Sequence, residues 1–306
     1  MSARFWVINL LAIGMALLLA CGATPAASTA GTLPPTPDAA ALVIDHTTTD
    51  LSQIPPEWLN AAKNLAFHFA HTSHGSQIVA GLEWWEAQRT ELDVEVRYDN
   101  VAARGRAAAL AIYDGNNYDG DNYITPEMYW SEEDGRNHTN QVADSGLFNY
   151  SMWSWCGQQS DNSVTAVNDY LNTLNQFEAA HPNMRFIYMT GHTDGGGATL
   201  ARNNQMVRDY VQANNKVLFD FADIESHDPA GNYYPDTDDS CPWCEQWCTD
   251  HPADCAGLES IPDCAHTHPL QCKQKAQAFW WMMARLAGWP GPGQATAATY
   301  LPVVNR

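Results

Sequence analysis

The chain has 306 residues and a formal net charge of -20, with 35 acidic against 15 basic side chains. Phosphate backbones and anionic lipid headgroups repel such a surface, so we expect no nucleic-acid partner and no electrostatic binding to a membrane. The length is enough for one sizeable α/β domain, and no internal repeat is evident.

The first residues are typical of an exported lipoprotein. Arg4 precedes an apolar run, and residues 18–21 form a lipobox that ends in a cysteine. Residues 1–20 are therefore predicted to be a signal peptide, and Cys21 the lipidated start of the mature chain. A membrane-spanning anchor is the rival interpretation, but the apolar run is short for a span. Residues 21–41, rich in Ala, Thr and Pro, predict a flexible tether. We expect a bacterial lipoprotein on the outer membrane or cell surface, in contact with the membrane only through the lipid anchor at Cys21.

From residue 42 to residue 290, short apolar runs alternate with amphipathic patterns. This alternation predicts one domain of the α/β class, a three-layer sandwich with a mostly parallel sheet of roughly five strands. Residues 102–147, rich in Asp, Asn, Gly and Tyr, are interpreted as a surface loop, and residues 291–306 as a C-terminal tail. Strands are expected over Leu65–Ala70, Val94–Tyr98, Leu147–Trp155, Met184–Thr190 and Lys216–Phe221, and helices over Ser76–Leu92, Asp161–Ala180, Ala198–Ala213 and Lys273–Ala287.

Six of the eight cysteines lie in one segment, which predicts a disulfide-rich insertion over residues 238–272. In an exported protein they are expected to form three disulfides of undetermined pairing, with Cys156 left as a buried thiol. A zinc ribbon fits less well, because the spacings do not give two regular C-x-x-C pairs. A redox motif is also weak, since no strand-to-helix context surrounds the single C-x-x-C. The six are Cys241, Cys244, Cys248, Cys255, Cys264 and Cys272.

Chemically active residues follow several of the predicted strands. Ser73 comes directly after the first strand, and a D-x-x-H pair, Asp263 and His266, precedes the last helix. In parallel α/β sheets, ligands bind beyond the carboxyl ends of the strands. We therefore expect Ser73 and His266 to meet at that edge, where a carboxylate-oriented imidazole can activate a hydroxyl.

Four such blocks resemble those of the SGNH (GDSL-type) hydrolases, over residues 64–288. Ser73 stands at the nucleophile position, Gly157 in the glycine block, His192 in the third block, and Asp263 with His266 in the final block. Three features depart from the family pattern. The family's Gly-Asp-Ser is His-Thr-Ser here, its third-block asparagine is His192, and the cysteine-rich insertion surrounds the last block.

The resemblance implies an extracytoplasmic serine esterase that acts on a small-molecule or glycan ester without a cofactor. His266 would accept the proton of Ser73, and Asp263 would hold the imidazole tautomer. The backbone N–H groups of Ser73 and Gly157, together with His192, would form the oxyanion hole. Ser76 and His268 are the alternative catalytic residues, and Ser73 is alternatively only a helix N-cap.

Two other functions remain open from the residues alone. The first is a metal site of zinc or copper, because histidines gather at the same predicted edge. The second is a glycan-binding protein without catalysis, in which Trp153 and Trp155 would face a sugar. A structural calcium site is also considered in an acidic loop. The metal candidates are His71, His74, His192, His266 and His268, and the calcium candidates are Asp114, Asn116, Asp119 and Asp121.

Overall fold

A computed structural model describes residues 40–100, 106, 108–261 and 263–293. Its strands form one parallel sheet in the order β1-β7-β6-β5-β2-β4-β3. The α/β class and the parallel sheet are confirmed, but the expected strand number is wrong, because the sheet has seven strands. The predicted signal peptide, Cys21 and most of the tether and tail lie outside the described residues. The strands are β1 (Leu42–Ile44), β2 (Ala66–His71), β3 (Val94–Arg97), β4 (Leu110–Asp114), β5 (Tyr150–Ser154), β6 (Arg185–Met189) and β7 (Val217–Phe219).

The two additional strands explain the error. β1 has only three residues, too few for a period-2 pattern to be visible next to the apolar tether. β4 is fully buried, yet it lies inside the segment interpreted as a surface loop and is followed at once by a stretch rich in Gly, Asp and Asn. That segment also contains α3 (Glu133–Asp144), a largely polar helix with Glu133 and Asp134 in its first turn. The surface-loop interpretation of residues 102–147 was therefore wrong.

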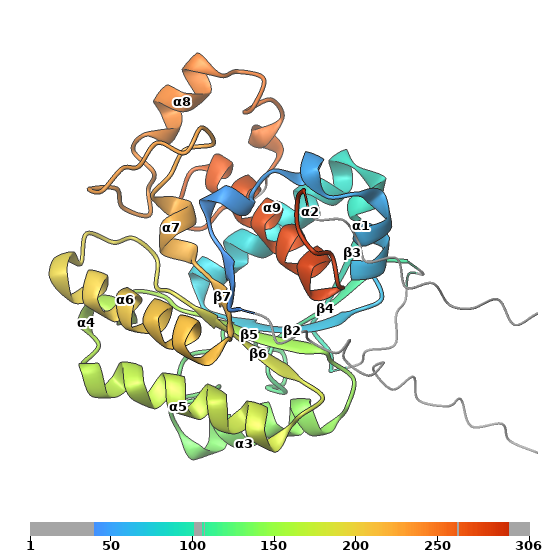
Figure 1. Cartoon of the computed structure of the whole chain (residues 1–306), viewed down its shortest axis with the longest axis vertical. Helices are drawn as coiled ribbons and strands as arrows, with labels where there is room; N and C mark the ends of the chain where they lie inside the picture. Colours follow the sequence, from blue (N-terminus) through green and yellow to red (C-terminus); the bar gives the residue numbers. More distant parts are fainter. Residues whose placement is uncertain (1–39, 101–105, 107, 262, 294–306) are drawn as a thin grey trace, which may run out of the picture.

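Helices cover both faces of the sheet (Figure 1). α1 (Pro56–Ala62), α2 (Ser76–Gln88) and α9 (Pro269–Leu286) lie on one face, and α3, α5 (Val164–Ala180) and α6 (Gly197–Asn214) lie on the other. The remaining helices are short: α4 (Gln158–Asp161), α7 (Phe221–Glu225) and α8 (Cys244–Asp250), with the 3₁₀ turns η1 (His46–Thr48), η2 (Leu51–Gln53), η3 (Ser73–Gly75), η4 (Thr90–Leu92) and η5 (Leu258–Ser260).

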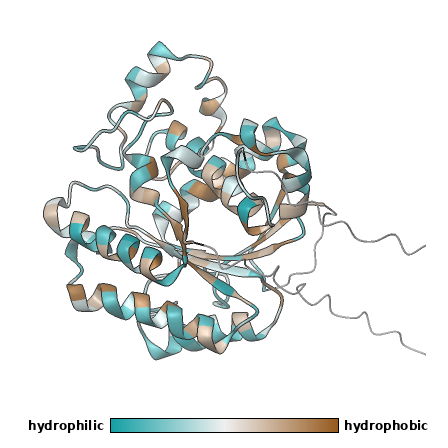
Figure 2. Cartoon of the chain, in the orientation of Figure 1, coloured by the Kyte–Doolittle hydropathy of each residue, from teal (hydrophilic) through white to brown (hydrophobic). Residues whose placement is uncertain are grey.

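The core lies between the sheet and these helices, as the apolar strands in Figure 2 indicate. Helix α9 is buried along most of its length, and Trp280 and Trp281 belong to the core as predicted from their helical position. Trp153 and Trp155 are also buried, at 0% and 1% exposure. The expectation that they face a ligand is therefore wrong.

The cysteine-rich segment forms a second, smaller cluster around Trp243 and Trp247, packed against Trp84 of α2. The three expected disulfides are present, and Cys156 is the free cysteine within the described residues, although it is half-buried and not buried as expected. No described helix combines the length and apolar character needed to cross a bilayer. The bridges join Cys241 to Cys244, Cys248 to Cys255, and Cys264 to Cys272.

Candidate active site

Three neighbouring strands bring their following residues to one edge of the sheet. Strand β2 leads into Ser73, β5 into Cys156 and Gly157, and β6 into His192. β2 lies between β4 and β5, and β5 pairs with β6. These are the strand ends at which ligands bind in open parallel sheets.

The turn that carries Ser73 is tightly packed. An added Cβ at Gly75 would lie 2.1 Å from the Cβ of His71, so only glycine fits there. Ser76 begins α2, and its hydroxyl donates to the Ser73 carbonyl oxygen at 2.6 Å. Ser76 is thereby engaged in the backbone of the turn, whereas Ser73 is half-buried with its hydroxyl turned to the site.

The Ser73 hydroxyl contacts two side chains. Its Oγ lies 3.5 Å from Nδ1 of His74 and 3.6 Å from Sγ of Cys156. It forms no hydrogen bond with His266 or His268, both of which are described residues. The nucleophile predicted from the sequence therefore lies beside an imidazole and a thiol, and its nearest imidazole is that of the adjacent residue.

Three histidine rings stack at this edge. His74 lies in the middle, with ring centroids 3.6 Å from His192 and 4.8 Å from His266. His74 is buried, and this burial, with the neighbouring His192, lowers its pKa to about 2. His266 is exposed and has a positive φ of 66°. Residues remote in sequence thus meet next to Ser73, with a neutral His74 between the other two rings.

A carboxylate not anticipated from the sequence faces the stack. Oδ2 of Asp239 lies 3.1 Å from Nε2 of His74 and 4.0 Å from Nδ1 of His192. Burial raises the pKa of Asp239, while the charges of His192 and His266 act to lower it. Asp263, by contrast, is exposed and forms no hydrogen bond or ion pair with His266, which is also a described residue. His268 caps α9, since its Nδ1 accepts from Leu270 N–H at 3.1 Å.

Cys156 and His192 form a thiol–imidazole pair. The contact with His192 is the largest cause lowering the pKa of the Cys156 thiol, to about 7. The pKa of His192 is raised, because contact with Cys156 and the charge of Glu225 outweigh burial. Nδ1 of His192 lies 3.0 Å from the Thr193 carbonyl oxygen, which leaves Nε2 for the sulfur. The contact between Cys156 and His192 shifts the pKa values of both side chains, although Nε2 of His192 forms no hydrogen bond of ordinary geometry.

A buried polar network supports the loops that carry the histidines. Lys275 and Glu225 are 0% and 2% exposed in their side chains and form an ion pair at 2.6 Å. Glu225 also accepts from the N–H and hydroxyl of Thr193, at 2.7 and 3.0 Å. Lys275 donates to Gln77, whose amide in turn donates to the Ala265 carbonyl oxygen. The network therefore links the residues next to His192 and His266 to α2, α7 and α9.

His71 and the calcium candidates make their hydrogen bonds and ion pairs outside the histidine stack. Nε2 of His71 is 3.0 Å from Oδ1 of Asp114, and both residues are buried. Asn116 donates to the Met128 carbonyl oxygen at 2.7 Å, and Asp121 accepts from the Tyr123 N–H. Asp119 is exposed, whereas Asp114 and Asn116 are buried, so the calcium candidates do not share one environment.

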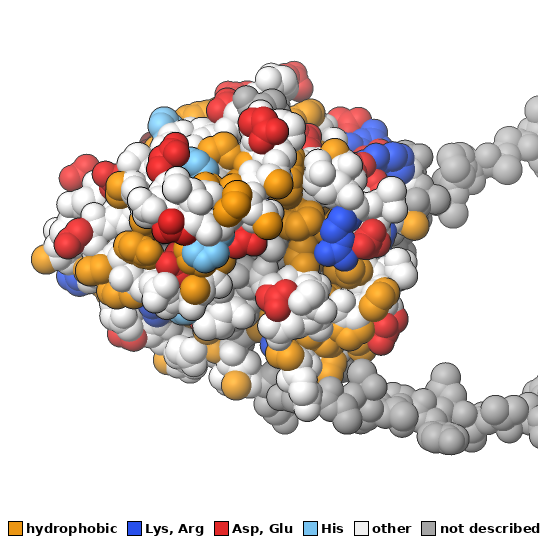
Figure 3. Space-filling view, turned by 90° about the horizontal axis from the view of Figure 1, so that it is seen from above, with side chains coloured by type: hydrophobic (Ala, Val, Ile, Leu, Met, Phe, Trp, Pro, Cys, Tyr) orange, Lys and Arg blue, Asp and Glu red, His pale blue; other side chains and the backbone are white. Residues whose placement is uncertain are grey.

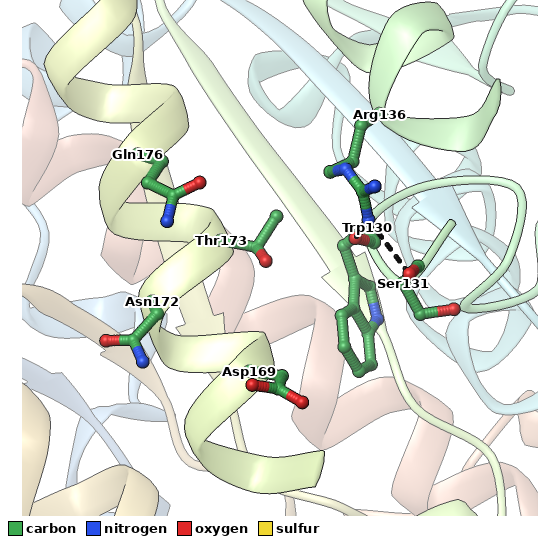
Figure 4. Close-up of a pocket in the computed structure, with 7 residues that line it drawn as sticks. All are labelled: Trp130, Ser131, Arg136, Asp169, Asn172, Thr173 and Gln176. Carbon is green, nitrogen blue, oxygen red and sulfur yellow. Dashed lines mark hydrogen bonds between the residues drawn. The ribbon is translucent and has the colours of Figure 1, made fainter. Parts of the chain in front are cut away.

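Acidic side chains are spread over the face of the molecule that Figure 3 shows, with a few histidine side chains among them. A separate hollow of about 440 Å³ lies between α5 and the start of α3, lined by polar groups such as Arg136 and Asp169 (Figure 4). It contains none of the residues contacting Ser73, so it is not part of this site.

Comparison of the chain with models of protein families, with curated proteins and with solved structures found no match. The site therefore has to be interpreted from its own geometry. Cys156 and Asp239 were missed as functional candidates. Cys156 directly follows a predicted strand and precedes Gly157, a position that could have identified it, whereas Asp239 lies in a loop with no sequence signal of its own.

Proposed function

We propose that the protein is an exported ester hydrolase of the SGNH type with Ser73 as its nucleophile. The observation that supports this most is the half-buried Ser73 at the carboxyl edge of a parallel sheet, beside a stack of three imidazoles that includes His266. Gly157 and His192 follow the next two strands, as the resemblance requires of the glycine and third blocks. This arrangement provides a nucleophile, imidazoles and oxyanion donors at one edge.

We assign the proton transfer to His266 rather than to His74. A base with a pKa of about 2 is a poor acceptor for a serine proton near neutral pH. His266 is the next ring in the stack and is exposed, so it can reach a hydroxyl when substrate orders the site. His74 is then a positioning residue between Ser73 and Asp239.

The negative charge that stabilises protonated His266 is assigned to Asp239. Its carboxylate interacts with the charge of His266, whereas Asp263 is exposed and makes no contact with that ring. In the reaction, Ser73 Oγ attacks the ester carbonyl carbon and its proton passes to His266. The N–H groups of Ser73 and Gly157 and the side chain of His192 stabilise the oxyanion, the protonated base releases the alcohol, and water hydrolyses the acyl-serine.

The substrate class is proposed from an exposed aromatic ring at the same edge. Tyr123 is 50% exposed and forms a β-bridge with His71, two residues before Ser73. Such a ring can stack on a sugar, which favours acylated glycans over free short esters. Tyr123→Ala is expected to raise KM for an acetylated glycan several-fold and to leave the hydrolysis of a short aryl acetate unchanged. Equal loss on both substrates would contradict the glycan assignment.

The nucleophile is tested with matched pairs of variants. Ser73→Ala is expected to lower kcat/KM for an aryl ester by a factor that corresponds to about 5 kcal/mol, while Ser76→Ala keeps most of the activity. His266→Asn should have a comparable effect, whereas His268→Asn retains a helix cap and the activity. A serine-directed phosphonate should label Ser73. Full activity of Ser73→Ala would refute the proposal.

The charge partner is tested in the same way. Asp239→Asn is expected to lower kcat by about 100-fold or more, because the imidazolium loses its counter-charge. Asp263→Asn should change kcat less than about 2-fold, as expected of a solvated carboxylate. The reverse result would return the role to Asp263.

A further inference from the structure

We propose that His74, Cys156 and His192 form a binding site for a thiophilic divalent cation, Zn²⁺ being the best match. One ligand atom from each of these residues, two nitrogens and a sulfur, lies within 4.8 Å of the others. Imidazole and thiolate are the ligands that zinc prefers in proteins. This inference goes beyond ester hydrolysis and does not rest on it.

Each histidine has its second ring nitrogen held by an acceptor. Nε2 of His74 lies 3.1 Å from the Asp239 carboxylate, and Nδ1 of His192 lies 3.0 Å from the Thr193 carbonyl oxygen. Metal-binding histidines typically donate their other N–H to a carboxylate or carbonyl group in this way, which fixes the tautomer and the ring orientation. The free nitrogens are then Nδ1 of His74 and Nε2 of His192.

The nitrogen left on His192 faces the Cys156 sulfur without a hydrogen bond of ordinary geometry. Its side chain is 5% exposed, and Nε2 is buried without a hydrogen-bond partner within the described part of the chain. A buried polar atom without a partner is costly, because it loses its hydrogen bonds to water. A cation bound to Nε2 removes this cost.

The separations around Ser73 fit a tetrahedral ion. Ligand atoms on zinc, at about 2.0–2.3 Å from the metal, lie about 3.3–3.6 Å from one another in a tetrahedron. The Ser73 Oγ lies 3.5 Å from Nδ1 of His74 and 3.6 Å from Sγ of Cys156. The Ser73 hydroxyl, or a water beside it, is therefore placed for the fourth position, and the half-buried Ser73 and Cys156 leave the site accessible.

The charges around the three ligands also suit a cation. Asp239 lies on the histidine side, and the charge of Glu225 acts on His192. Lys275 is the opposing positive group, but Glu225 pairs with it at 2.6 Å. A bound cation would take His192 away from the oxyanion role proposed above, so zinc is expected to inhibit ester hydrolysis.

The test is the binding of Co²⁺ and Zn²⁺ to the full chain. The protein is purified without a histidine tag and with its three disulfides intact, and bound metal is first removed with a chelator. Co²⁺ bound at this site gives visible d–d bands and a near-ultraviolet charge-transfer band from the thiolate. We expect one Co²⁺ per chain, displaced by Zn²⁺, and protection of Cys156 from alkylation by Zn²⁺. No saturable binding, or a spectrum without the thiolate band, would overturn the proposal.

Variants identify the ligands without using enzyme activity. Cys156→Ser and His192→Gln should each weaken binding by about 100-fold or more, and Asp239→Asn by about 10–100-fold. His227→Gln is the matched control, since His227 belongs to a second group, with His46 and Asp223, of possible ligands. Binding that survives Cys156→Ser and disappears in His227→Gln would refute the proposal. If Cys156→Ser does not fold, the role of Cys156 as a ligand is tested in the unmodified protein, where bound Zn²⁺ should protect its thiol from alkylation.

These experiments measure metal binding and not enzyme activity, so they test the zinc site even if the protein is not an esterase. Esterase activity without metal binding would refute only the zinc site. Metal binding without esterase activity would refute only the serine mechanism.

Discussion

The buried ion pair of Lys275 and Glu225 gives a quantitative prediction for Lys275→Met. Both side chains are almost completely buried, and the ammonium group also lies 4.0 Å from the centre of the Phe221 ring. Methionine fills similar volume but leaves the Glu225 carboxylate buried without its cation. Removal of one partner from such a pair costs about 3–5 kcal/mol of unfolding free energy.

A second substitution separates the stranded charge from the lost packing. Gln at position 225 is neutral, and its amide oxygen can still accept from the Thr193 N–H that Glu225 now binds at 2.7 Å. The double variant Lys275→Met/Glu225→Gln should therefore be more stable than Lys275→Met alone. Lys273→Met, on the same helix, is the control, because the Lys273 ammonium donates to the Asp254 carbonyl oxygen and its removal leaves no carboxylate buried without a cation. Its loss of stability should be smaller than that of Lys275→Met.

The measurement is urea denaturation at pH 7 under oxidising conditions, followed by tryptophan fluorescence and circular dichroism. A loss below about 1 kcal/mol for Lys275→Met would mean that water reaches the carboxylate, and would refute the argument. A double variant less stable than Lys275→Met would show that the stranded charge is not the dominant cost.

Three further outcomes are expected. Burial lowers the pKa of His68 to about 4, below the 6.5 of the unfolded chain. The stability that neutral His68 contributes is therefore complete above pH 6.5, and about 3 kcal/mol of it is lost as the pH falls towards 4. The free energy of unfolding should depend less steeply on pH in His68→Gln, and an identical slope would contradict the assignment. Gly81→Ala should destabilise the fold by about 1–3 kcal/mol, since the added Cβ would lie 2.1 Å from the Cys272 carbonyl oxygen of α9. Gln88→Ala, at an exposed position of the same helix, is the control and should not destabilise it. Equal melting temperatures of the two variants would argue against this close helix contact. Alkylation of the unreduced, denatured chain followed by peptide mapping should modify Cys156 and none of the six cysteines of residues 238–272, and any modified cysteine there would rule out the full set of bridges.

The sequence predicted those parts of the fold that have a strong local pattern. Strand β2 is a run of six buried residues, and α5 carries Val167, Leu171 and Leu174 on one face, so both were identified. Strand β1 and helix α3 were not, because the first is too short for a period to be visible and the second has few apolar residues besides Val142 and Ala143. Their place in the structure is decided by tertiary contacts, which override local preference.

The candidate site divides in the same way. The rule that ligands bind at strand ends led to Ser73, Gly157 and His192, but after β5 it was applied to Gly157 and not to the adjacent Cys156. Asp239 was not predictable, because it lies in an irregular loop whose position depends on packing against distant elements. The disulfide pairing was equally open, since six cysteines allow 15 pairings, and each cysteine proved to pair with its neighbour along the chain.

The bridge between Cys264 and Cys272 ties the loop before α9 to the first turns of that buried helix. His266 lies inside this covalent ring, and the other two bridges close rings that contain none of the stacked histidines. A chain kept in a reducing compartment would thus retain its sheet and helices but lose the covalent closure around His266. Under the proposed mechanism, reduction of this one bridge should lower ester hydrolysis while the sheet and helices stay in place.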